Sequence, residues 1–226
     1  MATSLNRPRV ILIGIAGPSC CGKSTYATHL IDHLQSPLHP IELDHFFIRS
    51  VPLNHPKLGR VLSEEEPETL FIEGLFTLLQ QIKTEPERIT RYHRSNISMQ
   101  DKKSICVIVE GFLLFALSDQ ITNLFDIRIF FESTLPQCRL RRYRRQKRID
   151  STIPDSEITI STSFQQWFDH LVWESHLKQR DLQISKSEKV FHSDQFQHEQ
   201  YAIIDDYIDK RLADIYASLK NIYQQS

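Results

Sequence analysis

One stretch near the N-terminus constrains the fold more than any other. It reads Gly17-Pro18-Ser19-Cys20-Cys21-Gly22-Lys23-Ser24 and fits the spacing G-x-x-x-x-G-K-[ST] without a gap. An apolar run of strand type precedes it over residues 10–16, and apolar residues at helical spacing follow it over 27–34. A strand, a glycine loop and a helix in this order are the context that a phosphate-binding loop requires. The stretch therefore predicts that the chain binds a nucleoside triphosphate.

Each part of this loop has a physical role. Glycines let the backbone curl around an anion with its N–H groups pointing inward, and the helix N-terminus adds a partial positive charge. Lys23 is expected to reach the β- and γ-phosphates, and the Ser24 hydroxyl to ligate Mg²⁺. The expected cofactors are therefore ATP and Mg²⁺. The nucleotide-binding residues predicted from the motif are Gly17, Ser19, Cys20, Cys21, Gly22, Lys23 and Ser24.

The composition suits one globular domain. The chain has 226 residues, of which 40% are hydrophobic, and six glycines, which favours a packed core over disorder. Its formal net charge of −1 gives no global attraction for nucleic acid or an anionic membrane, so neither is expected as a partner. The four cysteines show no C-x-x-C pairing, which disfavours a disulfide scaffold or a zinc site. With no targeting segment or apolar run of about 20 residues evident, we expect a cytoplasmic protein, with the nucleus as an alternative.

Two acidic residues end predicted strands. Asp44 follows a short apolar stretch, and Glu110 ends the apolar run 104–109, which is typical of a strand buried on both faces of a parallel sheet. In open α/β sheets the active site gathers at the carboxyl ends of the strands, so both acids are expected to face the phosphates. Two functions are open for Glu110, to hold Mg²⁺ through water or to orient the acceptor. The alternative for each acid is a purely structural role: Asp44 as a turn or cap residue, and Glu110 as the residue that ends a strand.

Seven basic residues lie within ten positions, from Arg139 to Arg148. One interpretation is a lid whose arginines neutralise charge on a transferred phosphoryl group. The others are a patch for nucleic acid or nuclear localisation, and a solvated basic helix. The lid is favoured because the rest of the chain has no basic excess and no nucleic-acid motif. On a helix from about Leu135, Arg141 and Arg145 share one face, so two or three arginines are expected to face the site.

The remaining stretches predict how the chain continues. Ser63 with Glu66 has the pattern of a capping box, and Pro67 suits the first turn of a helix. The expected elements are a loop over 49–62, a helix over 70–82, an exposed connection over 84–104, a strand over 126–132, a flexible loop over 149–165, a last strand at 190–191 and an amphipathic helix over 201–219.

Four segments in this order resemble a known group. The glycine loop, Asp44 with Phe46-Phe47, and Val109 to Phe115 are similar to the uridine kinase superfamily. Within it, residues 110–115 and 168–173 are most similar to nicotinamide riboside kinases, and 64–70 is loosely similar to the entry to the substrate helix. The resemblance covers most of residues 9–215. It implies a three-layer α/β phosphate-loop NTPase fold with a five-stranded parallel sheet and helices on both faces, as a single domain over 1–226 with a small lid at about 139–165.

The same resemblance implies roles for individual residues. Asp44 would be the general base toward the acceptor's 5′-hydroxyl, Ser24 and Glu110 would serve Mg²⁺, and Thr25 would bind phosphate. Glu65 stands where the family has an aspartate that grips the ribose hydroxyls. The residues that match the lid arginines are Arg141, Arg142 and Arg145.

Two departures from the family concern the base-stacking aromatics. Glu64 stands where the family has an aromatic residue, and residues 147–150 replace its tyrosine and double proline. Trp167 and Phe46 are the candidates to stack on the base instead.

These observations together predict an ATP-dependent kinase that phosphorylates the 5′-hydroxyl of a nucleoside-like small molecule, most simply nicotinamide riboside. Uridine, cytidine, pantothenate or a sugar acid stay open as acceptors. A non-catalytic nucleotide-binding regulatory protein is the alternative from a different class. A regulatory GTPase is disfavoured, because no N-K-x-D guanine signature occurs. The sequence does not specify an oligomeric state.

Overall fold

The computed structural model describes residues 8–94, 97, 104–193 and 198–224. It falls into two compact units, Met1–Asp194 and Gln195–Ser226. The described residues of the second unit form one helix, α7 (His198–Gln224), which confirms the helix expected over 201–219. Within the described residues, no helix is both long and apolar enough to span a membrane.

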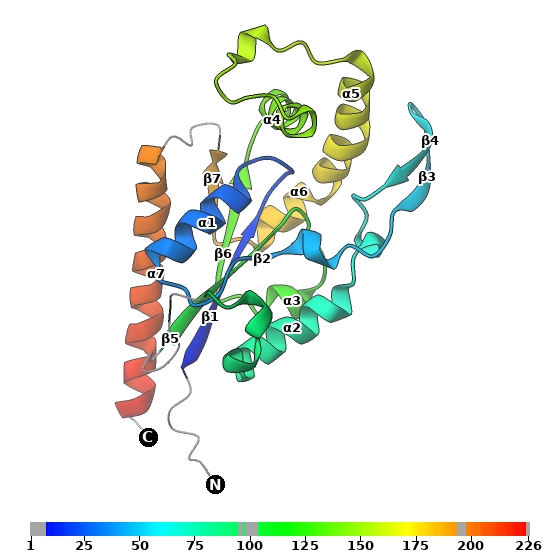
Figure 1. Ribbon diagram of the computed structural model, residues 1–226. Helices are drawn as coiled ribbons and strands as arrows, with labels where there is room; N and C mark the ends of the chain where they lie inside the picture. Colours follow the sequence, from blue (N-terminus) through cyan, green and yellow to red (C-terminus); the bar gives the residue numbers. More distant parts are fainter. Residues whose placement is uncertain (1–7, 95–96, 98–103, 194–197, 225–226) are drawn as a thin grey trace. The chain divides into compact units, whose positions relative to one another are not determined.

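A five-stranded sheet forms the centre of the first unit (Figure 1). The strand order is β2-β5-β1-β6-β7, and every neighbouring pair is parallel. The strands are β1 (Arg9–Ala16), β2 (Ile41–Glu42), β5 (Ser104–Gly111), β6 (Ile127–Glu132) and β7 (Lys189–His192). Long apolar runs form β1 and β5 because both faces of these strands are buried. The predicted α/β fold with a five-stranded parallel sheet is confirmed.

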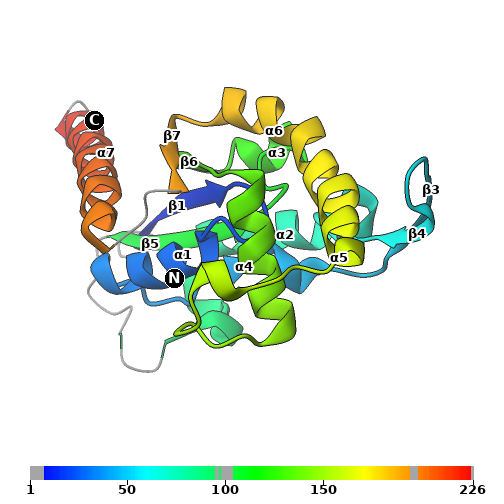
Figure 2. The same ribbon diagram turned by 90° about the horizontal axis from the view of Figure 1, so that it is seen from above.

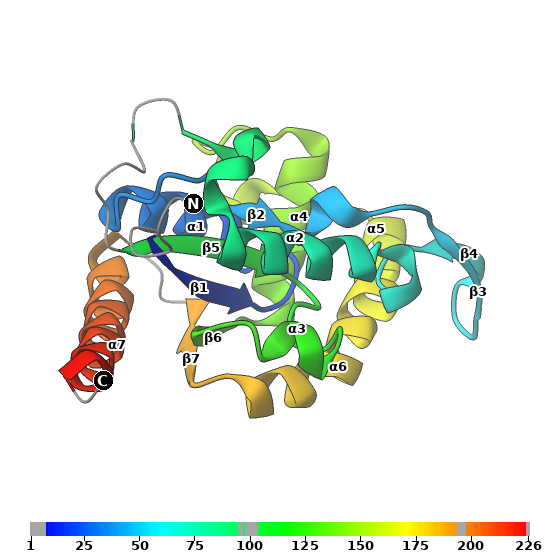
Figure 3. The ribbon, with the colours of Figure 1, turned by 90° about the horizontal axis from the view of Figure 1, so that it is seen from below.

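Helices cover both faces of this sheet. Along β1, Val10 and Leu12 belong to the same core cluster as Leu75 and Leu79 of α2 (Ile72–Thr84). The isoleucines between them are buried on the opposite face. Figure 3 shows α1 (Lys23–His33) on one side of the strands and α2 with α3 (Asp119–Thr122) on the other. The remaining helices are α4 (Leu135–Lys147), α5 (Thr162–Trp167), a π-helical segment (Phe168–Trp173) and α6 (Glu174–Lys186).

The helix α4 lies beyond the carboxyl ends of the strands (Figures 1 and 2). Arg144 on α4 donates hydrogen bonds to the carbonyls of Asp150 and Ile153 and to the carboxylate of Asp155, which ties the following loop to the helix. The flexible loop expected over 149–165 is therefore only partly correct. A 3₁₀ turn covers Asp155–Glu157, and α5 begins at Thr162, because Phe164 and Trp167 pack on neighbouring aromatics.

The loop expected over 49–62 is wrong. The structure has an antiparallel hairpin there, β3 (Val51–His55) with β4 (Gly59–Ser63), and the hairpin projects from the side of the unit (Figure 1). Pro52 is compatible with it because a two-stranded hairpin has only edge strands. Gly59 closes the turn with a φ of 70°, which favours glycine.

The capping box expected at Ser63 and Glu66 is also wrong. Ser63 ends β4, and its hydroxyl accepts a hydrogen bond from the amide of Glu65, at 3.1 Å. A 3₁₀ turn covers Pro67–Thr69, and α2 begins only at Ile72. The Thr69 hydroxyl donates to the carbonyl of Glu66, so this stretch closes on itself as a turn before the helix starts.

The connection after α2 is more ordered than the exposed stretch expected over 84–104. Short 3₁₀ turns cover η4 (Pro86–Arg88) and η5 (Thr90–Tyr92), and Ile89 and Tyr92 are buried. Arg94 donates to the carbonyls of Ile31 and Ser36 at the end of α1. Residues 95–96 and 98–103 of the expected connection lie outside the described residues.

Candidate active site

The glycine loop joins the end of β1 to the start of α1 at Lys23. Its backbone has positive φ at Gly17 (148°), Cys20 (66°) and Gly22 (102°). A side chain at Gly17 would clash with the carbonyl oxygen of Phe131 on β6, so the loop needs glycine there for space as well as for conformation. The structure thus has the tight turn onto a helix N-terminus that cradles phosphate.

Lys23 is the buried cation of this loop. Its side chain is 7% exposed, and Nζ donates to the carbonyl oxygen of Pro18 at 3.0 Å. Burial by itself lowers the pKa of the Lys23 ammonium, but the acidic groups around it, Cys21, Glu110 and Asp44, raise the pKa above its usual value. Lys23 is therefore charged at neutral pH, as a phosphate ligand must be.

Ser24 and Glu110 meet beside this lysine. The Ser24 hydroxyl donates to Glu110 Oε1 at 2.6 Å, and the Glu110 side chain is only 6% exposed. Burial raises the pKa of Glu110, while Lys23 and the Ser24 hydrogen bond oppose the rise. Hydroxyl and carboxylate oxygens are ligands that Mg²⁺ accepts, and Mg²⁺ in such sites needs only one or two protein ligands besides water and phosphate. These two side chains fit that ion.

Asp44 and Glu65 are two further acids that act electrostatically on one another, and Asp44 also acts on Lys23 and Glu110. Asp44 is on the exposed 3₁₀ turn η2 (Leu43–Phe46), and its charge acts on the pKa of Lys23, Glu65 and Glu110. Burial raises the pKa of the half-buried Glu65 to about 7, against a lowering by Arg142. Asp44 therefore acts on both Glu65 and Glu110, although the three acids are far apart along the chain.

The raised pKa of Glu65 predicts that Glu65→Gln stabilises the fold at high pH. Ionising Glu65 costs free energy in the folded state above its usual pKa of 4.5, so the penalty grows as pH rises to about 7 and is then constant. We expect the variant to unfold about 3–6 °C higher than the parent at pH 8, and at the same temperature at pH 4. Thermal unfolding at both pH values measures this. Glu68→Gln, an exposed neighbour, is the control, and an equal gain from it would contradict the burial effect.

Two of the three lid arginines predicted from the sequence contact the glycine loop. Arg142 Nη1 donates to Ser19 Oγ at 3.4 Å, and Arg141 Nη1 donates to the Cys20 carbonyl at 3.5 Å. Arg145 is exposed, and its guanidinium makes no hydrogen bond or ion pair with any described residue. The expectation that only some of these arginines face the site agrees with this arrangement.

The two aromatic candidates for base stacking lie in different places. Trp167 packs against Phe164 and Phe168, and the Arg142 guanidinium lies over its ring, 5.9 Å from the centroid. Trp167 therefore lies beside Arg142, the residue whose charge also lowers the pKa of Glu65. Phe46 lines a separate pocket along α2. Thr25 is exposed on the first turn of α1.

One cluster near the site has no counterpart in the sequence-based predictions. Lys57 at the hairpin turn donates to Glu174 Oε1 at 3.0 Å, and His170 Nδ1 lies 2.9 Å from the same oxygen. The His55 ring stacks on His170 with 6.4 Å between centroids. The cluster fastens the tip of the hairpin to the helix that follows Trp167. Because Lys57 and Glu174 are 117 residues apart, no local pattern indicates their pairing.

Comparisons with known proteins agree with this geometry. No family model matches the chain. A uridine kinase of Ureaplasma parvum serovar 3 is 25% identical over 177 residues, which cover 72% of this chain and 84% of that protein. A uridine kinase of Shewanella denitrificans is 28% identical over 190 residues, with 73% and 84% covered.

A solved structure shows the same fold. The putative fructose transport system kinase from Silicibacter sp. TM1040 aligns with a TM-score of 0.50 over 84% of this chain and 93% of its own, at 16% identity. The fold, the glycine loop with its buried lysine, and the likeness to uridine kinases agree with one another. The chain is similar to uridine kinases over most of its length and has the fold of a P-loop kinase, which supports a phosphotransferase that acts on a hydroxyl group.

Proposed function

We propose that this chain is a nucleoside kinase that uses ATP and Mg²⁺ to phosphorylate a 5′-hydroxyl, with a pyrimidine nucleoside such as uridine or cytidine as the acceptor. The observation that carries the proposal is that Asp44, which follows β2, acts electrostatically on Lys23 and Glu110 at the carboxyl ends of β1 and β5, and also on Glu65. The likeness to curated uridine kinases supports the pyrimidine acceptor.

On the donor side, the loop amides and Lys23 hold the β- and γ-phosphates of ATP. Ser24 and Glu110 would hold Mg²⁺, which would neutralise charge on the phosphate oxygens. Arg141 and Arg142 contact the loop from α4, where they can stabilise the transferred phosphoryl group. We assign residues from about 139 to 165 as a lid, because the hydrogen bonds of Arg144 make α4 and its loop one piece.

On the acceptor side, Asp44 accepts the proton of the attacking hydroxyl, and Glu65 accepts hydrogen bonds from the ribose hydroxyls. The transition state for phosphoryl transfer is loose, so the proton leaves late and Asp44 acts mainly by orienting the oxygen. Glu65 accepts best when ionised, and its raised pKa of about 7 makes acceptor binding tighter as pH rises through neutrality. Trp167 is placed beside Arg142 to stack on the base.

A second acceptor, nicotinamide riboside, is favoured by the acidic character of this side of the site. Glu64 and Glu66 flank Glu65, and the charges of both raise its pKa, as does that of Asp44. A nicotinamide ring linked to ribose carries a positive charge, which such a group of carboxylates attracts. The resemblance of residues 110–115 and 168–173 to nicotinamide riboside kinases points the same way.

An acceptor panel tests the proposal. ADP release from ATP is measured with uridine, cytidine, nicotinamide riboside and pantothenate, each with and without Mg²⁺. We expect a pyrimidine nucleoside to give the highest kcat/KM, and we expect turnover to need Mg²⁺. If nicotinamide riboside is preferred instead, its KM should rise with salt far more than that of uridine, because screening weakens charge attraction. If no acceptor stimulates ADP release, the kinase assignment fails with it.

A further inference from the structure

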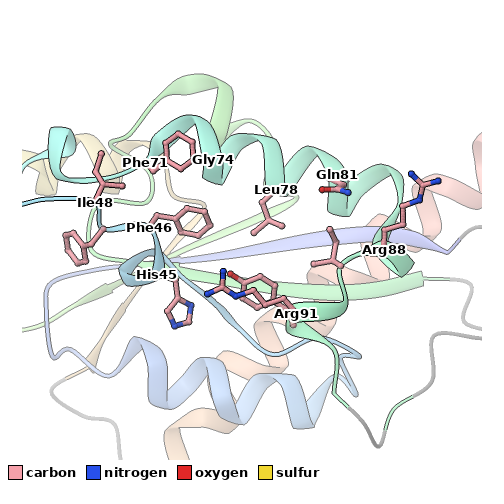
Figure 4. A pocket seen from close by; sticks show the side chains of 12 residues that line it. His45, Phe46, Ile48, Phe71, Gly74, Leu78, Gln81, Arg88 and Arg91 are labelled. Carbon is pink, nitrogen blue, oxygen red and sulfur yellow. The ribbon is translucent and has the colours of Figure 1, made fainter.

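A pocket with no role in the proposed reaction lies along α2. Its volume is about 460 Å³, and it is walled by η2, by one face of α2, and by η4 and η5 (Figure 4). Among the site residues predicted from the sequence, only Phe46 lines it. The lining residues that the following paragraphs use are His45, Phe46, Phe71, Leu78, Arg88 and Arg91.

The wall between η2 and α2 is apolar. Phe46 and Leu78 lie between these two elements, and Phe71 lies at the end of α2, beside Gly74 (Figure 4). A side chain at position 74 would collide with the Phe71 ring, so glycine in this helix keeps that ring close to the pocket wall. Phe71 is 51% exposed, so about half of its ring surface is open beside the pocket wall. This part of the pocket offers room for an apolar or aromatic group.

The other end of the pocket is cationic. Arg91 extends toward His45 (Figure 4), and its guanidinium lies over the Tyr92 ring, 5.7 Å from the centroid. Arg91 makes no ion pair with any described residue, whereas Arg88 is held by Glu85 at 2.8 Å. Burial raises the pKa of Tyr92, the charge of Arg91 lowers it, and the charge of Glu42 raises it, so both charges act on this end of the pocket. A guanidinium with this freedom suits a carboxylate, sulfonate or phosphate.

We propose that this pocket binds an amphiphilic organic anion, with its apolar body between η2 and α2 and its anionic group on Arg91. The proposal goes beyond the kinase reaction and does not depend on it. The site would lie next to the reacting centre, because η2 carries Asp44 one residue before His45. The backbone joins the two walls as well, since the amide of Phe71 donates to the carbonyl of Phe46 at 2.8 Å.

The test uses 8-anilinonaphthalene-1-sulfonate, a fluorescent aromatic anion, with the full chain. We expect one saturable site whose Kd rises about tenfold in Arg91→Gln, because a hydrogen-bonded charge is lost. Arg60→Gln, an exposed arginine on β4, is the matched control and should leave the Kd unchanged. An equal Kd in Arg91→Gln and the parent would overturn the proposal, and so would displacement of the dye by a non-hydrolysable ATP analogue.

A second measurement needs no variant. 4-Phenylbutyrate and its uncharged amide differ only in the anionic group, so we expect the acid to displace the dye at a concentration about tenfold lower than the amide does. Equal displacement by both compounds would mean that the pocket binds only their apolar part, and this would refute the anion site.

Discussion

We expect Asp44→Asn to lower kcat by about 10²–10⁴-fold while the affinity for an ATP analogue changes by less than about threefold. The amide keeps the size of the side chain and cannot take the hydroxyl proton. The Asp44 side chain is exposed on η2, and the Asp44 carbonyl accepts a hydrogen bond from the amide of Phe47, which the substitution leaves in place, so the fold should tolerate the change. ADP release at saturating ATP and acceptor gives kcat, and a fluorescent ATP analogue gives the affinity.

A matched control separates this effect from a general loss of negative charge. Asp181→Asn removes a carboxylate on α6 that is 90% exposed and whose partner among the described residues is Arg180, so it should leave kcat unchanged. A parallel loss of ATP binding in Asp44→Asn would make Asp44 a metal or structural residue. In that case the proton acceptor would have to be sought elsewhere among the acids of the site.

The sequence could predict the sheet and the turn of the glycine loop because both are encoded locally. The strands β1 and β5 are continuous apolar runs, and the loop that follows β1 is a single uninterrupted motif. The position of Glu110 follows from the same pattern. Parallel strands with buried centres bring their carboxyl ends to one edge of the sheet, and there Ile15 of β1 pairs with Glu110 of β5. In each of these cases, neighbours in sequence determine the geometry.

The hairpin β3–β4 could not be predicted in this way. The hairpin β3–β4 has weak apolar alternation, and Leu62 on it is 68% exposed, so its strands have no buried face to mark them. The two-stranded hairpin is marginal by itself, and its contact with Glu174 through Lys57 supplies stability from a distant part of the chain. Such long-range pairing has no periodicity to detect.

The basic helix shows the same limit at the level of single residues. Spacing indicates that not all arginines of α4 point one way, but it does not say which ones have other partners. The structure shows that Arg139 pairs with Asp169 at 2.7 Å and that Arg144 is held by Asp155. Their partners leave Arg141 and Arg142 to contact the glycine loop. The choice depends on acids that are 11 and 30 residues away, which only the fold brings near.

The second large effect concerns Lys23, for which Lys23→Met should reduce kcat/KM for ATP by at least about 10³-fold. Methionine keeps most of the buried volume and removes the charge, so packing around the loop is retained and the phosphates lose their central cation. The change also leaves the buried Glu110 without the charge that opposes the rise in its pKa. Glu110 is then protonated more readily, and the Mg²⁺ ligand weakens together with the phosphate contact.

This double loss distinguishes Lys23 from an ordinary phosphate contact. The affinity for a fluorescent ATP analogue should fall both with and without Mg²⁺. The gain in this affinity on adding Mg²⁺ should also be smaller in the variant, because the substitution disturbs both the phosphate contact and the Mg²⁺ ligand Glu110. Lys178→Met, an exposed lysine on α6, serves as the control and should behave like the parent. Normal turnover in Lys23→Met would mean that the loop holds no reacting phosphate, since no other described cation is buried at the start of α1.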